Sequence, residues 1–338
     1  MIRIEPFTLD RRAAVHEFNK RIGPSGFDYP EEPAEGHFLA LEQEDVRGGY
    51  ILRRQQFVFS GEAREVAHYR LPISEGIVNK AYATLGMQLL RHALKQQPML
   101  YALGMGGLQN PLPQMLKAMG WGVWSVPFFF KVNHPARFLR NVRPLRKSAA
   151  RRMLLDAAAL TGAGWVGLKF VQRPVGEAAR CELAYSFTPW ADDIWTNAKA
   201  QYQAIAERDA ATLDSWYPSE QVRLRVGSQG WALALDTQMR EDHYFGDMRL
   251  GSIADCMAAP GDAAEVIRAA TRFLEQRGVD LIVSNQLHHA WQNALRSAGF
   301  REGPSNFVFA ASKKLTELIS NPAEVHMNRG DGDGPIHL

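Results

Sequence analysis

Two segments of this chain that lie far apart end in the same short pattern. QMLKAMGW runs from Gln114 to Trp121 and NALRSAGF from Asn293 to Phe300, and each closes on Gly and an aromatic residue. Glycine commonly ends helices, so two octapeptides alone would be a weak match. The match extends without gaps, however, because residues 96–121 align with residues 275–300 and each stretch follows an amphipathic run. The extended match predicts two modules with the same order of elements.

Size and composition suit two soluble modules. The 338 residues allow about two domains of roughly 150 residues each. A content of 46% hydrophobic and 22% charged residues is typical of a globular protein, and a formal charge of +3 does not by itself indicate nucleic acid. The two cysteines, Cys181 and Cys256, argue against a disulfide framework and suit a reducing compartment. The start lacks the apolar segment of a signal peptide, and no segment has the roughly 20 apolar residues that cross a bilayer, so we expect a cytoplasmic protein.

The pattern of the first half predicts an α/β module. Period-two alternation and turn residues predict its strands, and amphipathic runs predict its helices. EDVRGG is interpreted as a hairpin connection, and WGVWSVPFFFKV, the most apolar stretch, is placed in one buried strand. The expected strands are 2–6, 37–43, 50–59, 65–73, 99–105 and 121–132, and the expected helices are 10–21, a helix that ends near 95, and 111–119.

The second half, from about Trp165, repeats this order. One long helix is expected over DDIWTNAKAQYQAIAERDAATLDSWY, residues 192–217. Each half would then hold a mainly antiparallel sheet with helices packed against it. The remaining expected strands are 221–226, 230–237, 247–257, 279–284 and 305–312, with one helix before residue 279 and another at 290–298.

This order of elements resembles the GNAT (Gcn5-related) N-acyltransferase fold in tandem, over nearly the whole chain. The resemblance implies the α/β (α+β) class, with two modules that each hold a mixed, mainly antiparallel sheet flanked by helices. In this family a helix begins at a loop that holds the coenzyme A pyrophosphate on backbone N–H groups, and the fifth strand splays from the fourth to admit the pantetheine arm. The implied parts are an acyl-CoA-binding module (1–133), a basic linker (134–160), a second module (161–320) and a C-terminal tail (321–338).

Electrostatics, rather than a motif, assigns the coenzyme to the first half. The family loop R/Q-x-x-G-x-G/A is intact in neither half, and the corresponding loop here is SEGIVNKAYATLG, residues 74–86. Residues 76–97 contain no Asp or Glu, so the helix that starts within them is open to an anion. The implied coenzyme-binding residues are Gly76, Asn79, Lys80, Gly86 and Asn110.

The corresponding loop of the second half carries negative charge. It reads AAPGDAAEV, in which Asp262 and Glu265 have the D-x-x-E spacing of a capping box. A diphosphate that arrived there would meet like charge. We therefore expect the second half to have lost or altered the coenzyme-binding role.

The usual general acid of the family is missing. GNAT enzymes commonly protonate the leaving thiolate with a Tyr four residues before the Gly-aromatic pair, where this chain has Leu116 and Leu295. The candidate catalytic residues are instead His68, Glu75 and Asp255, on or beside the strands that would line the slot.

Each catalytic candidate has a structural alternative. Histidine can accept a proton near neutrality because its ordinary pKa is about 6.5, but His68 could also be hydrogen-bonded within the sheet. Glu75 could be a solvated loop residue. Asp255, between Ala254 and Cys256, must either find partners or take a raised pKa. Tyr69 and Tyr101 are interpreted as sheet or core residues.

Polar residues toward the C-terminus form the candidate acceptor site. His288 and His289 open the last expected helix, which one of them could cap. The ending HMNRGDGDGPIHL has the composition of a loose tail, yet its polar side chains could order over a cleft. Its D-x-D lacks the other ligands of a metal loop, and no metal is expected. The candidate substrate-binding residues are His288, His326, Arg329, Asp331 and Asp333.

The ending and the stretch AGFREGPSNFVFA resemble tandem GNAT-like proteins from bacterial exopolysaccharide gene clusters. This resemblance implies transfer of an acetyl group, or another short acyl group, from its coenzyme A ester to an amino sugar or a sugar-linked intermediate. If the tail closes over this acceptor, deletion of the residues after Pro322 should abolish transfer and leave folding intact.

Residues 134–152, HPARFLRNVRPLRKSAARR, carry seven Arg or Lys and no acid. They are either a solvated linker or a contact for an anionic partner, such as an anionic lipid surface. Two other functions remain open: a Fem-like aminoacyl-tRNA-dependent transferase, whose long helical insertion is not evident here, and a degenerate GNAT pair that acts as a binding module. No nucleic acid partner is expected, and the oligomeric state is unknown.

Overall fold

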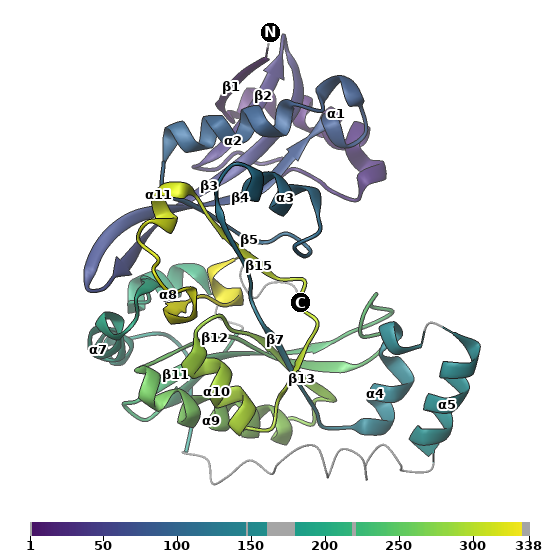
Figure 1. Ribbon diagram of the computed structural model, residues 1–338, viewed down its shortest axis with the longest axis vertical. Coiled ribbons are helices and arrows are strands. Elements are labelled where there is room, and N and C mark those ends of the chain that lie inside the picture. The colour runs from purple at the N-terminus through teal and green to yellow at the C-terminus, as the bar shows by residue number, and fades with distance from the viewer. Residues whose placement is uncertain (1, 147, 161–179, 218–220, 333–338) are drawn as a thin grey trace. The chain divides into compact units, whose positions relative to one another are not determined.

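The computed structural model describes residues 2–146, 148–160, 180–217 and 221–332. The chain forms two units, each built from both halves of the sequence. Unit 1 comprises Met1–Phe57, Ala63–Trp124 and Val308–Ser320, and unit 2 comprises Val58–Glu62, Ser125–Phe307 and Asn321–Leu338. Figure 1 shows the segment β15, late in the chain, among the strands of unit 1, and the early segment β7 within the sheet of unit 2.

Unit 1 is a mixed sheet with helices on both faces. Its strands lie in the order β1-β2-β3-β4-β5-β15-β6, and β4 and β5 are parallel. The strands are β1 (Ile2–Pro6), β2 (His37–Glu42), β3 (Asp45–Phe59), β4 (Glu62–Ser74), β5 (Leu100–Gly104), β6 (Gly122–Ser125) and β15 (Val308–Ala311). The helices are α1 (Arg12–Ile22), α2 (Leu85–Gln96), α3 (Pro111–Ala118) and α11 (Lys313–Thr316).

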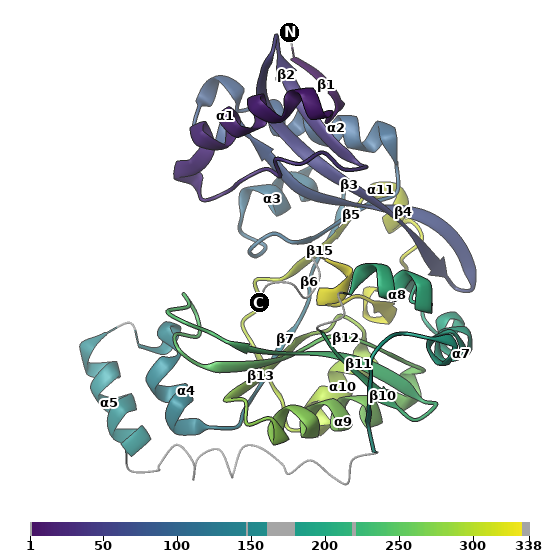
Figure 2. The same ribbon diagram turned by 180° about the vertical axis from the view of Figure 1, so that it is seen from behind.

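The alternation along β2 decides which helix covers which face. Leu39 and Leu41 pack with α1 in one hydrophobic cluster, whereas Ala40, on the opposite face, belongs to the cluster that contains Leu89 of α2 and Leu116 of α3. Figure 2 shows α1 and α2 on opposite sides of these strands. The N-terminus of α2 is thereby held on one face, at the end of the β4–α2 connection.

The hairpin between β2 and β3 turns earlier than the sequence suggested. EDVRGG was predicted as the connection, but the turn is formed by Gln43 and Glu44, and β3 already begins at Asp45. Gly48 and Gly49 lie within β3, where a Cβ atom on Gly48 would come 2.7 Å from the carbonyl oxygen of Ile73. These glycines allow close approach of neighbouring backbone and side chains rather than a turn.

Unit 2 is a second mixed sheet, in the order β14-β7-β13-β12-β11-β10-β8, and β12 and β13 are parallel. Its strands are β7 (Phe128–Val132), β8 (Glu182–Ala184), β10 (Val222–Val226), β11 (Gly230–Gln238), β12 (Arg249–Ala258), β13 (Leu281–Asn285) and β14 (Arg301–Gly303). Two short strands, β9 (Ala204–Ala206) and β16 (Val325–His326), are not part of this sheet, because they pair with each other and β9 pairs with β3. The helices are α4 (Pro135–Asn141), α5 (Ala149–Leu160), α7 (Pro189–Ala198), α8 (Ala210–Trp216), α9 (Ala263–Gln276) and α10 (His289–Ser297).

The long helix expected in unit 2 was wrong, and the basic stretch contains helices. The long helix predicted over residues 192–217 is α7, strand β9 and α8, because Asp209 starts a new helix by accepting a hydrogen bond from Thr212 N at 2.8 Å. The basic stretch 134–152, predicted as a linker, contains α4 and the start of α5. These two helices pack against each other (Figures 1 and 2).

The two halves of the sequence exchange their last strands. β7, from the first half, pairs with β13 from Leu281↔Val132 to Asn285↔Phe128, and β15, from the second half, pairs with β5 from Val308↔Gly104 to Ala311↔Tyr101. The single strand predicted at 121–132 is therefore β6 and β7, in different sheets, with Pro127 between them. The two units consequently do not follow a division of the chain at residue 133.

The exchange predicts that neither half folds alone. A fragment of residues 1–133 lacks β15 and leaves the β5 edge open, and a fragment of residues 134–338 lacks β7. Expressed separately, each should be insoluble or unfolded by circular dichroism, whereas co-expression should give one folded complex in size-exclusion chromatography. A folded, soluble 1–133 fragment would contradict this.

Candidate functional site

In unit 1 the strands β4 and β5 separate after a short ladder. Only two parallel pairs, Ala67↔Leu100 and His68↔Tyr101, join them, although β4 continues to Ser74. Leu71, three residues beyond the ladder, has a φ of 45°, which is strained for a residue other than glycine. The sheet order places no other described strand between β4 and β5. We call this separation the unit 1 wedge.

His68 lies at the closed end of the unit 1 wedge. Its ring stacks on Tyr101, with ring centroids 4.5 Å apart and an interplanar angle of 5°, and Gln55 Nε2 donates to the Tyr101 hydroxyl at 2.5 Å. Burial, with a smaller effect of Arg53 and Arg70, lowers the pKa of His68 well below its ordinary value. The ring is therefore neutral near pH 7. Its Nδ1 has no hydrogen-bond partner among the described residues.

Glu75 lies directly after β4 and anchors the loop that follows it. Its carboxylate is 5% exposed and accepts hydrogen bonds from Arg21 Nε at 3.2 Å and from Arg47 Nη1 at 3.2 and 3.4 Å. The predicted alternatives were a base or a solvated loop residue. Two guanidinium groups on one carboxylate make it an ion-pair anchor between α1, β3 and the loop.

The loop from Gly76 to Gly86 ends at an uncapped helix. Asn79 caps a short 3-10 turn, where its Oδ1 accepts from Ala81 N at 3.1 Å, and Lys80 opens that turn with an exposed side chain. At the start of α2, Thr84 makes no side-chain capping hydrogen bond, and the first turn contains no acid. Gly86 lies in this first turn, and a Cβ atom there would contact nothing within 4 Å. The backbone N–H groups of this helix start are the kind of donors to which an anion can bind.

Other residues predicted from the resemblance have mainly structural contacts. Asn110 precedes α3 as its N-cap residue but donates from Nδ2 to the carbonyl oxygen of Met105 at 3.0 Å. Gly76 approaches its own loop closely, since a Cβ atom there would lie 2.5 Å from the carbonyl oxygen of Tyr82. Leu116 and Leu295, at the usual tyrosine position, are fully buried core residues of α3 and α10. The described helices thus supply no acid from that position.

The equivalent helix start in unit 2 differs from the prediction. Asp262 is the N-cap residue of α9, but its side chain makes no capping hydrogen bond, so the expected capping box does not form. Its backbone is in the right-handed helical region because a 3-10 turn, Pro260–Asp262, runs directly into the helix. Glu265 still places a carboxylate in the first turn, and the negative charge remains.

In unit 2 the corresponding wedge is filled. The β12–β13 ladder ends at Ser252↔Val283, and a bulge at Ala254 follows. One residue beyond the end of the ladder, Ser284 Oγ donates a hydrogen bond to the carbonyl oxygen of Ile253 at 2.9 Å. The C-terminal segment Val325–Gly332 then lies against both strands, because His326 Nε2 bonds to the carbonyl oxygen of Cys256 at 3.0 Å and Gln286 forms a β-bridge with Asn328.

Asp255 is the centre of a fully buried polar cluster. Arg208 donates to it from Nε at 3.2 and 3.3 Å and from Nη2 at 3.1 Å. Tyr217 Oη at 2.6 Å, Asn328 Nδ2 at 2.8 Å and Cys256 N at 2.8 Å are the other donors. The sequence left open whether this carboxylate would find partners, and the structure shows that it does.

Asp331 completes this cluster from the C-terminal segment. Its Oδ1 accepts from Arg208 Nη2 at 2.8 Å and its Oδ2 from Asn328 N at 2.9 Å. Burial raises the pKa of Asp331, against the lowering effect of Arg208. For Arg208 itself burial acts to lower the pKa, but Asp255 and Asp331 raise it above its ordinary range. Arg208, Asp255 and Asp331 therefore stabilise one another as ions in a site that is closed to solvent.

The two predicted histidines of unit 2 are also buried. His288 caps α10, where its Nδ1 accepts from Ala290 N at 3.1 Å, which confirms the capping alternative. Burial, with a smaller effect of His289, lowers the pKa of His288 to about 4. Burial lowers the pKa of His326 well below its ordinary value as well, and its Nδ1 has no partner among the described residues. A carbonyl oxygen only accepts, so the proton of His326 is on Nε2.

The structure thus separates the predicted site residues. His68, Glu75, the loop residues and Asn110 belong to unit 1, whereas Asp255, His288, His326, Arg329 and Asp331 belong to unit 2. Burial lowers the pKa of Arg329, and Asp333 lies outside the described residues. Because Val325–Gly332 is built into unit 2, deletion after Pro322 should cost stability, unlike the sequence-based expectation that folding stays intact.

Sequence reasoning missed Arg208, Tyr217 and Asn328, the residues that hold Asp255. Arg208 and Tyr217 fell within the long helix expected at 192–217. The available signal was Asp209, a capping residue in the middle of that stretch. Nothing in the tail distinguished Asn328, whose partner is 73 residues earlier in the chain.

We predict that Asp255→Asn lowers the free energy of unfolding by about 3 kcal/mol, because it leaves the buried Arg208 charge short of a partner. Urea denaturation of the variant and the wild type measures this. An unchanged free energy of unfolding together with lost turnover would instead indicate a catalytic base.

We predict that His288 makes the protein acid-sensitive. Its folded-state pKa of about 4 lies below the unfolded value of about 6.5, so the unfolded state binds more protons between these values. Stability should fall as pH is lowered through this window, by roughly 3 kcal/mol for this residue.

The variant His288→Asn tests this because Asn also caps helices. It should match the wild type above pH ~7 and lose less stability at pH ~4.5 in urea titrations. The same acid-induced loss in both proteins would exclude His288 as the cause.

No protein-family model matches the sequence, and no curated protein matches it. Solved structures do. N-myristoyltransferase from Saccharomyces cerevisiae, with bound myristoyl-CoA, is similar over 92% of this chain and 78% of its own, with a TM-score of 0.54 and 8% identity. A GCN5-related N-acetyltransferase from Anabaena variabilis is similar over 92% of this chain and 72% of its own, with a TM-score of 0.53 and 9% identity. The likeness confirms the predicted fold class, two GNAT-like mixed sheets flanked by helices.

Proposed function

We propose that this chain is an acyl-CoA-dependent N-acyltransferase that binds its donor in unit 1. The observation that carries the proposal is the difference between the two wedges. In unit 2 the C-terminal segment fills the wedge, and Glu265 places negative charge at the adjoining helix start. In unit 1 the ladder ends at His68 and Tyr101, and the helix start of α2 has neither acid nor side-chain cap.

The donor would lie along β4 in extended form. Its diphosphate would bind at the start of α2, near Gly86 and Lys80, where backbone N–H groups and a lysine favour anions. The pantetheine arm would run between β4 and β5 toward the His68–Tyr101 stack. Because both of these side chains are buried and in contact, the wedge would end there, and we favour acetyl-CoA or another short acyl-CoA as the donor.

The reaction would be direct attack of an amine on the thioester carbonyl. The C–N bond forms, the C–S bond breaks, and coenzyme A leaves with the proton that the amine loses. Backbone N–H groups around Leu71, where β4 departs from regular strand geometry, would polarise the carbonyl. Of the three predicted catalytic residues, His68 has a ring nitrogen without a described partner, and we assign it the transfer of the amine proton.

Glu75 and Asp255 receive positioning roles in this proposal. Glu75 orders the loop that leads to α2 through Arg21 and Arg47. Asp255 and Asp331, through Arg208, hold the C-terminal segment in the wedge of unit 2. The substrate-binding roles predicted for His288, His326 and Arg329 stay predictions.

The acceptor and the cellular setting rest on the sequence resemblance. We retain an amino sugar, or a sugar-linked intermediate of polysaccharide synthesis, as the proposed acceptor, and the cytoplasm as the proposed location. None of the described helices has both the length and the apolar character needed to cross a membrane. Contact with anionic lipid through residues 134–152 is part of the same proposal.

The donor site can be tested by calorimetric titration with acetyl-CoA. We expect one site in the wild type and a dissociation constant weakened about tenfold in Gly86→Glu and in Lys80→Glu. A carboxylate in the first turn suits the helix itself, so Gly86→Glu should keep its melting temperature while repelling the diphosphate.

Gly261→Glu is the matched control. Gly261 lies in the turn before α9, and a Cβ atom there also contacts nothing within 4 Å. This variant should bind acetyl-CoA as the wild type does. Equal weakening in both glycine variants, or no binding by the wild type, would contradict a donor site in unit 1. Tighter binding of myristoyl-CoA than of acetyl-CoA would contradict the short-chain assignment.

A further inference from the structure

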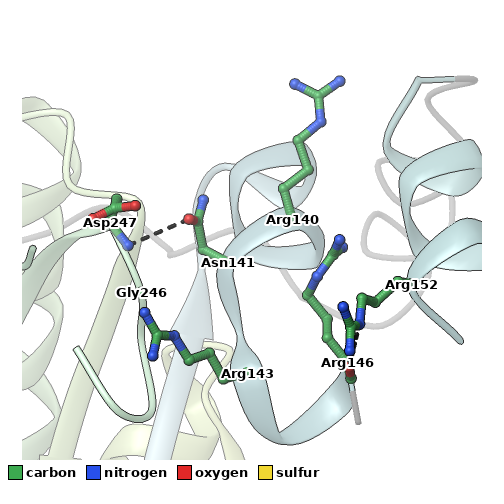
Figure 3. A pocket seen from close by; sticks show the side chains of 7 residues that line it. All are labelled: Arg140, Asn141, Arg143, Arg146, Arg152, Gly246 and Asp247. Carbon is green, nitrogen blue, oxygen red and sulfur yellow. Dashed lines mark hydrogen bonds between the residues drawn. The ribbon is translucent and has the colours of Figure 1, made fainter. Parts of the chain in front are cut away.

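Four arginines, all within the basic stretch 134–152, line a pocket in unit 2 that lies outside the proposed donor site. Its volume is about 380 Å³, and its lining comprises Arg140, Asn141, Arg143, Arg146, Arg152, Gly246 and Asp247. This volume is within the range of small-molecule sites. Figure 3 shows that the arginines come from α4, α5 and the turns between them, opposite the loop that carries Gly246 and Asp247. We call it the arginine pocket.

The local sequence builds this pocket. Arg137, Arg140, Arg143 and Arg146 recur at every third residue, where α4 runs into a 3-10 turn, so several of them share one side of the segment. The loop between β11 and β12 docks against the end of α4. Arg143 N donates to the carbonyl oxygen of Tyr244 at 3.1 Å.

Gly246 permits this docking. It has a φ of 59°, and a Cβ atom there would lie 2.9 Å from the carbonyl oxygen of Asn141. Asp247 N also donates to Asn141 Oδ1 at 3.3 Å (Figure 3). The wall opposite the arginines is therefore held by backbone contacts rather than by side-chain charge.

The arginines of this segment differ in whether an acidic side chain pairs with them. Outside the pocket, Arg137 pairs with Asp280 at 3.1 Å, and within it Arg146 is held by both oxygens of Asp156, at 2.7 and 3.0 Å. Arg140 and Arg143 are exposed, and no described residue accepts a hydrogen bond from either guanidinium group. The lining thus has more positive than negative charge.

The remaining lining groups leave this charge available. Arg152 Nε is used by the carbonyl oxygen of Arg146, at 3.1 Å. The only acid of the lining, Asp247, accepts from Glu241 N through Oδ1 at 2.8 Å. Several arginines that line one pocket favour a ligand with several acceptor oxygens, and a phosphate has that chemistry.

We propose that the arginine pocket binds a phosphate or diphosphate group of an acidic ligand. This site is independent of the proposed donor site in unit 1. The phosphate can belong to a soluble ester or to a lipid head group. The lipid source is included because three apolar side chains of α5, those of Met153, Leu154 and Leu160, are 75%, 70% and 75% exposed.

Two probes separate the sources. Calorimetric titration with inorganic pyrophosphate tests a free phosphate group, and co-flotation with phosphatidylglycerol vesicles, against phosphatidylcholine vesicles, tests a lipid phosphate. The variant Arg140→Glu/Arg143→Glu should weaken whichever binding is found at least about tenfold, and raised salt should weaken it too. Pyrophosphate binding supports a soluble ligand, and binding to phosphatidylglycerol vesicles alone supports a lipid-borne one.

Three controls keep the test decisive. Arg272→Glu changes the charge of an exposed arginine on α9, outside the pocket, and should have no effect on binding. Gly86→Glu should also leave the pocket's binding intact, so failure of the donor-site proposal and failure of this one are distinguishable. Melting temperatures verify that each variant is folded. Binding of neither probe, or equal loss in Arg272→Glu, would overturn the proposal.

Discussion

The exchange of strands constrains everything else in this chain. β5 has β15 on its outer side and β13 has β7, so each parallel pair that opens into a wedge is flanked by a strand from the other half of the sequence. A strand fixed on one side by an antiparallel ladder can separate from its parallel neighbour on the other side and still be held in the sheet. The exchange thus lets β4 and β5 separate after two pairs while β5 stays in the sheet.

The two wedges differ because a buried cluster of charges holds the C-terminal segment in the wedge of unit 2. In unit 2, Arg208 binds Asp255 on β12 and Asp331 in the C-terminal segment, all without solvent exposure. Such a cluster is costly to break because each removed partner leaves a buried charge. It therefore fixes the C-terminal segment against β12. Unit 1 has no equivalent ion pair across its wedge among the described contacts.

The sequence was sufficient for what depends on local pattern. The internal match, the alternation of strands and the apolar periodicity of α2, α9 and α10 predicted two similar modules, and the strand Ile2–Pro6 was placed at its observed bounds. Prediction from the sequence failed where a contact between residues far apart in the chain determines the structure. No local signal shows that β7 and β15 leave their own halves, because an antiparallel partner from either half satisfies the same apolar pattern. The same holds for Asp255, whose partners come from three separate segments.

The charges at the two helix starts differ independently of any capping motif. The capping box expected at Asp262 does not form, yet the inference about anions did not depend on it, since Glu265 remains in the first turn of α9 and α2 has no acid there. A helix start attracts or repels a diphosphate through the sum of nearby charges, which changes little when one hydrogen bond is absent. Glu265 in the first turn of α9 and Lys80 before α2 therefore make the two helix starts electrostatically different, whichever capping hydrogen bonds form.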